Sequence, residues 1–277
     1  MIEQALSKTS TGPGTSVAFG PIKTVLLDYD GCTADTEPQA LRKLTDVLNR
    51  MLVSKNCNDL LEYEYVVKNL TGRTCRDILI EVATKRNLTL TEPEIEKWVA
   101  EEREENIKGF KENVTPSPGV KEALPELKTV MGLEVAIVSS SHGQRIEACM
   151  DTLGQGEFIE KSHIFSAQSS LDKPKPKPDP AIYLHALEKL GREATECIAV
   201  EDSSTGARAA RRAGILLVGF VGTEPVSRHH ERAEMLFECG ARWVIKDMTK
   251  LPIIVNKIGS GEISALDREF GPEAWVN

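Results

Sequence analysis

The sequence lacks any apolar run approaching the ~20 residues that a helix needs to cross a lipid bilayer. It also lacks a CxxC pair, and no cysteines and histidines stand together at the spacing of zinc ligands. These absences exclude a membrane-spanning helix, a zinc site of the usual kind and a disulfide scaffold. We interpret the six scattered cysteines as free thiols of a reducing compartment, mostly buried. They are Cys32, Cys57, Cys75, Cys149, Cys197 and Cys239.

Positive charge is in deficit. The chain carries 34 Lys and Arg against 42 Asp and Glu, a formal net charge of −8. This balance argues against nucleic acid or an anionic membrane as a partner, because both attract basic surfaces. It leaves an anionic small molecule possible, since the potential inside a pocket need not follow the net charge.

The N-terminal stretch, residues 1–19, has no arginine and no apolar core of a signal peptide. Its Ser, Thr, Gly and Pro content predicts a flexible leader, and we expect a cytoplasmic location. With 277 residues, 40% hydrophobic and 27% charged, the chain has the composition of a soluble globular protein. Its length suits one large domain, or a core with a modest second domain.

Short apolar runs rich in β-branched residues alternate with segments of helical pattern over much of the chain. Asp179, Pro180 and Gly191 mark the start and end of one such helix. Strands that are apolar on both faces and alternate with helices predict an α/β fold with a doubly wound, parallel, Rossmann-like sheet. The expected strands are Ile22–Leu27, Leu133–Val138, His163–Ala167, Cys197–Val200, Ile215–Val221 and, more weakly, Trp243–Ile245.

Residues 35–115 break this alternation, because they carry several helical patterns and almost no strand signal. One of these patterns opens at Thr91 with Glu94 three residues later, which is typical of a capping box. We therefore expect an all-helical cap domain at 35–115, inserted into a core formed by 20–34 and 116–255. Thr115–Gly119 would be the hinge, and 256–277 a C-terminal tail.

Polar residues follow four of the expected strands. The first strand is followed by Asp28-Tyr29-Asp30-Gly31, the second by Ser139-Ser140-Ser141, the third by the loop Lys173–Asp179, and the fourth by Glu201-Asp202. Because ligands of doubly wound sheets bind beyond the carboxyl ends of the strands, we expect these groups to share one crevice. Carboxylates brought this close repel one another unless a hard divalent cation lies between them. A phosphate would complete the set, since magnesium bridges carboxylate and phosphoryl oxygens.

These four segments resemble the four motifs of the haloacid dehalogenase superfamily. DYDGCTADTE at 28–37 is similar to its first motif, Ser139 after VAIV to its second, KPKPD at 175–179 to its third and VEDSSTG at 200–206 to its fourth. The order and spacing match over roughly residues 20–255. The helical insertion after the first motif is like the cap of the phosphoglucomutase-like and small-metabolite phosphatase branch.

The resemblance implies a role for each motif residue. Asp28 would attack phosphorus and form an aspartyl-phosphate, and Asp30 would act as the general acid and then the general base. Mg²⁺ would be held by Asp28, by the backbone carbonyl of Asp30, by Asp202 and, through a water, by Glu201. The phosphoryl oxygens would be held by Ser139, Ser140 and Lys175, the last chosen over Lys173 and Lys177 from the register of the motif. Cys32 and Thr33 depart from the usual Thr and Leu of the first motif, with little effect expected.

The cap is expected to set specificity. Gly72-Arg73-Thr74-Cys75-Arg76 resembles the cap loop that reaches the active site in this branch, so Arg73 or Arg76 is a candidate to clamp a substrate oxygen. The expected partner is a small phosphorylated metabolite, most plausibly a sugar or polyol phosphate, and the expected assembly is a monomer or small homo-oligomer.

Other activities stay open. A phosphomutase of the same branch usually carries a cap histidine twelve residues after the nucleophile, where this chain has Ala40. A phosphonoacetaldehyde-type hydrolase uses a cap lysine, for which Lys68 is a candidate, but it usually lacks the acid at Asp30. A dehalogenase also usually lacks that acid. A silent binding module would not need Asp28, Asp30 and Asp202 together. A magnesium-dependent phosphatase is therefore the leading hypothesis.

Overall fold

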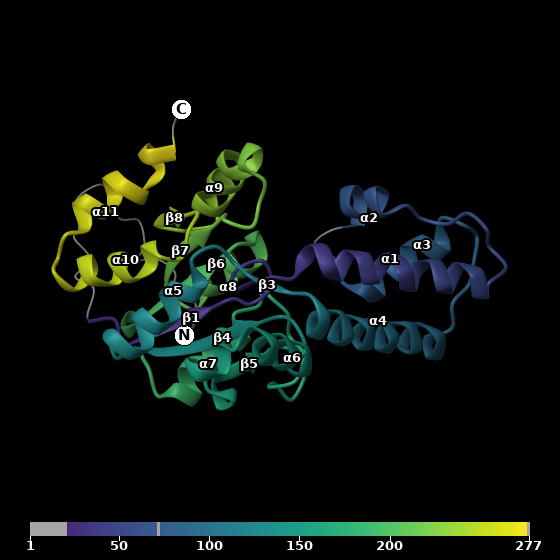
Figure 1. Ribbon diagram of the computed structural model, residues 1–277, viewed down its shortest axis with the longest axis horizontal. Helices are drawn as coiled ribbons and strands as arrows, with labels where there is room; N and C mark the ends of the chain where they lie inside the picture. The colour runs from purple at the N-terminus through teal and green to yellow at the C-terminus, as the bar shows by residue number, and fades with distance from the viewer. Residues whose placement is uncertain (1–20, 71–72, 276–277) are drawn as a thin grey trace, which may run out of the picture.

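Six parallel strands form the central sheet of the protein, whose computed structural model describes residues 21–70 and 73–275. The order across the sheet is β5-β4-β1-β6-β7-β8, and every neighbouring pair is parallel (Figure 1). This confirms the predicted doubly wound α/β sheet. The strands are β1 (Thr24–Leu27), β4 (Glu134–Ser139), β5 (Ile164–Ser166), β6 (Cys197–Glu201), β7 (Leu216–Phe220) and β8 (Trp243–Ile245).

Helices cover both faces of this sheet. Successive strand residues point to opposite sides, so each strand presents apolar side chains to the helices on both faces. On β1, Val25 and Leu27 belong to one apolar cluster and Leu26 to the other. The first cluster also contains residues of α5, α6, α10 and α11, and the second contains residues of α7, α8 and α9. The bounds are α5 (Val120–Pro125), α6 (Gly143–Leu153), α7 (Ala181–Leu190), α8 (Ser204–Arg212), α9 (His229–Glu238), α10 (Lys250–Gly259) and α11 (Ile263–Phe270).

Four helices follow β1 and lie to one side of the sheet, where α1 and α4 run alongside each other (Figure 1). They bury an apolar cluster of their own that includes Leu48 and Trp98. The predicted capping box of Thr91 and Glu94 is present at the start of α4. We refer to this group as the cap helices: α1 (Glu37–Ser54), α2 (Tyr63–Leu70), α3 (Cys75–Thr84) and α4 (Glu92–Glu112).

Two short strands connect the cap helices to the core. β2 (Ala34–Asp35) pairs antiparallel with β3 (Thr115–Pro116), so the outgoing and returning chain lie next to each other. The remaining short helical turns are Glu126–Val130, Gln155–Glu157, Lys161–His163, Ala194–Glu196, Val226–Arg228 and Pro272–Trp275.

Much of the segment that the sequence presents as a tail packs on the core. Leu266 and Phe270 of α11 are buried in the first cluster. Asp267 of the same helix forms an ion pair with Arg242 and accepts a hydrogen bond of 2.9 Å from Nε1 of Trp243. The predicted flexible leader, residues 1–19, and the last two residues of the tail lie outside the described residues.

All six cysteines are free thiols, four of them buried and two, Cys57 and Cys75, half-buried. None of the described helices combines the length and the apolar character that crossing a membrane requires.

Candidate active site

The loop after β1 holds Asp28 at the carboxyl edge of the sheet. The backbone N–H of Asp28 donates to the carbonyl of Val200 on β6, and Oγ1 of Thr33 donates to the carbonyl of Asp28 at 2.5 Å. Gly31 turns this loop with a φ of +78°, and a Cβ atom at that position would lie only 2.6 Å from Oδ2 of Asp202. A glycine is therefore needed for the loop to approach Asp202 so closely. Asp28 is left almost fully buried, with its side chain 11% exposed.

The lysine that reaches Asp28 is Lys177. Its Nζ donates to Oδ1 of Asp28 at 2.6 Å, to Oε1 of Glu201 at 2.5 Å and to the carbonyl of Val138 at 2.7 Å. Its side chain is only 3% exposed, whereas Lys175 is exposed. The expectation that Lys175 is the lysine of the site is therefore wrong by two residues.

The physical reason lies in the repeating loop. Three lysines alternate with prolines between 173 and 178, so each gives the same local pattern. The fold distinguishes them, because the backbone N–H of Lys177 donates to Oγ of Ser140 at the end of β4, which draws that residue under the sheet edge.

Glu201 anchors this lysine. It is fully buried, and its Oε1 accepts from Lys177 and from the hydroxyl of Tyr183 at 2.5 Å. A Cβ atom at Gly206 would stand 1.8 Å from Oε2 of Glu201, so α8 can pass this carboxylate only with a glycine. Burial raises the pKa of Glu201 to about 7, although Lys177 lowers it. Sequence reasoning missed Tyr183 in this role, because an aromatic residue on a helix reads as core.

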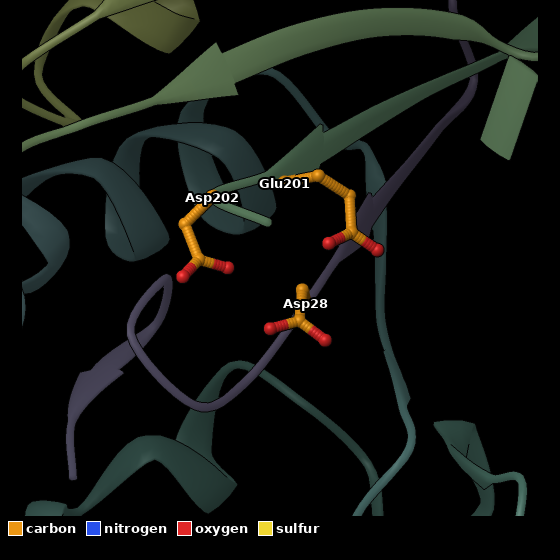
Figure 2. Close-up of side chains that lie close together, drawn as sticks. All are labelled: Asp28, Glu201 and Asp202. Carbon is orange, nitrogen blue, oxygen red and sulfur yellow. The ribbon is translucent and has the colours of Figure 1, made fainter. Parts of the chain in front are cut away.

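Three carboxylates form an acidic cluster at the sheet edge: Asp28, Glu201 and Asp202, each offering an oxygen within 4.8 Å of the others. Figure 2 shows Glu201 and Asp202 extending from the end of β6 with Asp28 facing them. Burial, and then the charge of Asp28, raise the pKa of Asp202 well above its ordinary value. Burial also raises the pKa of Asp28 despite the attraction of Lys177.

This cluster has the chemistry of a divalent-cation site. One lysine balances only one of the three carboxylate charges, and buried carboxylates in excess are stable only when protonated or paired with further positive charge. Oxygen donors of this kind suit a hard cation such as Mg²⁺. The side chain of Asp30 lies outside the cluster, so Asp30 could contribute only through its backbone carbonyl, as the sequence resemblance implies.

Asp30 makes a separate set of contacts. Its Oδ1 accepts from Oγ1 of Thr36 at 2.5 Å and from Nη2 of Arg145 at 2.9 Å, and its Oδ2 accepts from Oγ of Ser141. Burial on its own would raise the pKa of Asp30, but the guanidinium of Arg145 and these hydrogen bonds lower it below its ordinary value. Arg145 was missed from the sequence, because it comes from α6 and nothing in the local pattern links it to a loop more than a hundred residues away.

The two candidate phosphate-binding serines stand beside this site. Ser139 is 1% exposed, and its Oγ accepts from the backbone N–H of Ser141 at 3.0 Å. The Oγ of Ser140 accepts a hydrogen bond from the backbone N–H of Lys177. Both serines therefore shape the loops around Asp28 and Lys177, and their contact with a phosphate stays a prediction.

The two cap arginines pair within the cap. Arg73 forms an ion pair with Glu81, and Arg76 forms ion pairs with Glu92 and Glu96. Among the described residues, neither has an ion pair or hydrogen bond with the acidic cluster. Their expected role in substrate binding is not supported by these contacts and stays a prediction.

A doubly wound sheet with an acidic cluster and a buried lysine at its carboxyl edge is an arrangement that enzymes of such folds use for their active sites. The model of the haloacid dehalogenase-like hydrolases matches residues 22–214. The chain belongs to this family, which confirms the resemblance of its four motifs.

Individual relatives agree with this assignment. The chain is 31% identical to "Phosphoglycolate phosphatase" of Nitrosospira multiformis over 70% of this chain and 81% of that one. It is 27% identical to "Phosphorylated carbohydrates phosphatase" of Thermotoga maritima over 70% and 82% of the two chains. The crystal structure of a haloacid dehalogenase-like protein from Agrobacterium tumefaciens superposes with a TM-score of 0.65 at 26% identity, covering 86% of this chain and 99% of that one. The chain spans only 37% and 38% of the length of two Arabidopsis thaliana relatives that it also matches.

Proposed function

We propose that this protein is a Mg²⁺-dependent phosphatase that hydrolyses a small phosphate monoester, a sugar or polyol phosphate, through an aspartyl-phosphate on Asp28. One observation carries the proposal: the buried carboxylate of Asp28 is paired with Lys177 and also offers an oxygen within 4.8 Å of one from Asp202. The names of the relatives support phosphate ester hydrolysis, and the six free cysteines fit the proposed cytoplasmic location.

In the first step, a carboxylate oxygen of Asp28 attacks the phosphorus atom and the bond to the ester oxygen breaks. Asp30 gives its proton to the departing alcohol, so the alcohol leaves neutral. Lys177 offsets part of the negative charge of the phosphoryl oxygens, as Ser139 and backbone N–H groups at the strand ends could also do.

In the second step, Asp30 takes a proton from water, and the resulting hydroxide attacks the phosphorus of the aspartyl-phosphate. Phosphate leaves and the carboxylate of Asp28 is restored. Arg145 and the hydrogen bonds to Asp30 favour its ionised form, which is the form that this second step requires. For the first step, Asp30 has to take up a proton when the ester binds.

The donors proposed for Mg²⁺ are the carboxylates of Asp28 and Asp202 and the backbone carbonyl of Asp30, with Glu201 acting through a water. Bound there, the ion would neutralise charge on the phosphoryl group and on Asp28. Because Glu201 already accepts two hydrogen bonds on Oε1, its main task in the proposal is to fix Lys177.

Two alternatives lack the residues that they would need. Ala40, where a mutase of this branch usually carries histidine, packs against the apolar core and offers no proton-transfer group. Lys68, the candidate for a phosphonoacetaldehyde-type hydrolase, is exposed on α2. Both observations favour transfer of the phosphoryl group to water.

A phosphate-release screen over sugar, polyol and other phosphate esters tests the proposal, with Asp28→Asn as the test variant and Asp172→Asn, an exposed loop change, as the matched control. We expect Asp28→Asn to lose several orders of magnitude in turnover, and acid quenching of the wild type to trap a phosphorylated aspartate at position 28. Activity of Asp28→Asn within tenfold of the wild type would refute the assignment.

A further inference from the structure

Arg145 connects Asp30 with the cap helices. Helix α4 of the cap packs against α6 of the core, and Arg145 belongs to α6. Its Nη2 donates to Oδ1 of Asp30 at 2.9 Å. The Cζ atom of the same guanidinium lies 5.1 Å from the centroid of the Phe110 ring on α4, and the charge of Glu102, also on α4, attracts it. One core side chain is therefore held by Asp30 and by the cap together.

The stability of α6 does not explain this arginine. The helix begins at Gly143, so Arg145 lies in its first turn. A cation in that turn is unfavourable, because the N-terminus of a helix carries partial positive charge. The position of Arg145 is therefore fixed by its contacts outside the helix. Of the three side chains that hydrogen-bond Asp30 in the described part of the chain, Arg145 is the charged one, and charge-assisted hydrogen bonds are about twice as strong as neutral ones.

The two oxygens of Asp30 are held differently. Oδ1 accepts from Nη2 of Arg145 and from Oγ1 of Thr36, whereas Oδ2 accepts from Oγ of Ser141. A carboxylate oxygen has two acceptor sites, so both sites of Oδ1 are occupied and Oδ2 keeps one. The side chain of Asp30 is 26% exposed, so solvent reaches this carboxyl group. A proton can thus be held at Oδ2 without breaking any of the three hydrogen bonds.

The proposed mechanism needs the Asp30 carboxyl in one fixed orientation, first toward the ester oxygen and then toward water. Resting on that proposed function, we infer that Arg145 is a positioning residue: secured by α4, it holds Oδ1 of Asp30 so that Oδ2 gives a proton to the departing alcohol and later takes one from water. Arg145 transfers no proton itself, because a guanidinium keeps its charge. Its effect on the rate comes through Asp30.

Arg145→Met tests the inference, because it removes the donor and the charge. The readout is the single-turnover rate of phosphorylation of Asp28 by two esters, p-nitrophenyl phosphate and the best alkyl ester of the phosphate-release screen. We expect the alkyl rate to fall roughly 10²-fold, the usual cost of a misplacement of about 1 Å, and the p-nitrophenyl rate to fall much less, since phenolate needs little protonation. The ratio of the two rates does not depend on how much of the variant is folded.

The same change in an Asp30→Asn background completes a double-mutant cycle. There Arg145→Met should alter the alkyl rate by less than about twofold, because no acid is left to position. A role in substrate binding or in the fold would instead cost the same factor in both backgrounds. Arg208→Met, the same change at an exposed position of α8, should leave the ratio of the two rates as it is.

Two cap variants test the hold of α4 on Arg145. Phe110→Leu removes the ring but stays apolar, and Glu102→Gln removes the charge but keeps an oxygen to accept from Nδ2 of Asn106. Each should lower the alkyl rate relative to the p-nitrophenyl rate by roughly two- to tenfold, the usual worth of a cation–π contact or a nearby charge. Glu104→Gln, at an exposed position of α4, is the matched control and should leave this ratio unchanged.

Three results would overturn the inference alone: an equal loss on both esters in Arg145→Met, the same loss with and without Asp30, or unchanged ratios in both cap variants. Failure of the proposed function gives a different result. No ester, including p-nitrophenyl phosphate, would then release phosphate in a manner that depends on Asp28, and the inference would fall with it.

Discussion

Replacing Lys177 with methionine tests the centre of the site most directly. Methionine keeps nearly the length of the side chain but removes the charge and three hydrogen bonds, of 2.5, 2.6 and 2.7 Å. The carboxylates of Asp28 and Glu201 are then left buried and facing each other. Removing one partner of a buried charge pair costs about 3–5 kcal/mol in free energy of unfolding. We expect Lys177→Met to lower the free energy of unfolding by about this amount.

The loss should depend on pH. Burial raises the pKa of Glu201 to about 7 even with Lys177 present, and without the lysine the pKa values of both carboxyls rise further. An acid whose folded pKa is raised binds a proton on folding, so its contribution to stability is full below its unfolded pKa and is lost as pH rises through its folded pKa. Lys177→Met should therefore be least destabilised near pH 5 and most destabilised above pH 7.

Denaturant unfolding at pH 5 and pH 8, in EDTA, measures this difference, and phosphate release measures the function. We expect kcat/KM to fall by about 10²–10³, the usual cost of losing one group that stabilises developing charge. Lys175→Met and Lys173→Met are matched controls on exposed lysines of the same loop, and both should stay within about 0.5 kcal/mol of the wild type. If Lys175→Met lost the activity while Lys177→Met kept it, our reading of this loop would be wrong.

Three other predictions concern the same site. Asp30→Asn should slow phosphorylation of Asp28 by alkyl phosphates roughly 10²–10⁴-fold but by p-nitrophenyl phosphate much less, since phenolate needs little protonation; single-turnover rates that fall equally on both esters would contradict the acid role. Gly206→Ala should lower the free energy of unfolding by about 1–3 kcal/mol, the usual cost of overpacking, because its Cβ would stand 1.8 Å from Oε2 of Glu201. In thermal unfolding, Gly259→Ala, where no atom lies within 4 Å of the new Cβ, should be tolerated, and equal stability of the two variants would argue against this packing. EDTA should abolish hydrolysis, added Mg²⁺ should restore it and Ca²⁺ should inhibit, because its larger shell accepts extra carboxylate oxygens; full activity in EDTA would remove the metal from the mechanism.

The sheet could be predicted closely, because buried parallel strands have a strong local signature. All six expected runs became strands within two residues of their predicted ends, including the weak run Trp243–Ile245. The C-terminal helix α11 was missed, since only Leu266 and Phe270 of its eight residues are buried and the segment has few large apolar residues.

The acidic half of the site was predictable for the same reason, because Asp28 and Asp202 stand directly after strands whose carboxyl ends must meet. The basic half was not. The choice among three equivalent lysines depends on a hydrogen bond between Lys177 and Ser140, and the contact of Arg145 with Asp30 depends on how α6 packs. Such choices are made by tertiary geometry, and a local pattern carries no information about them.

The pairing of β2 with β3 has a consequence for how such a molecule can change. Ala34 lies opposite Pro116 and Asp35 opposite Thr115, so the chain leaves the core and returns to it through adjacent strands about 5 Å apart. A short turn could bridge these two points without disturbing β1 or β4. The cap helices are thus an insertion whose two ends are adjacent. An insertion of another length or sequence could replace them without a change in the path of the core chain. Such a change would leave Asp28, Lys177 and Asp202 in place, because all three come from the core.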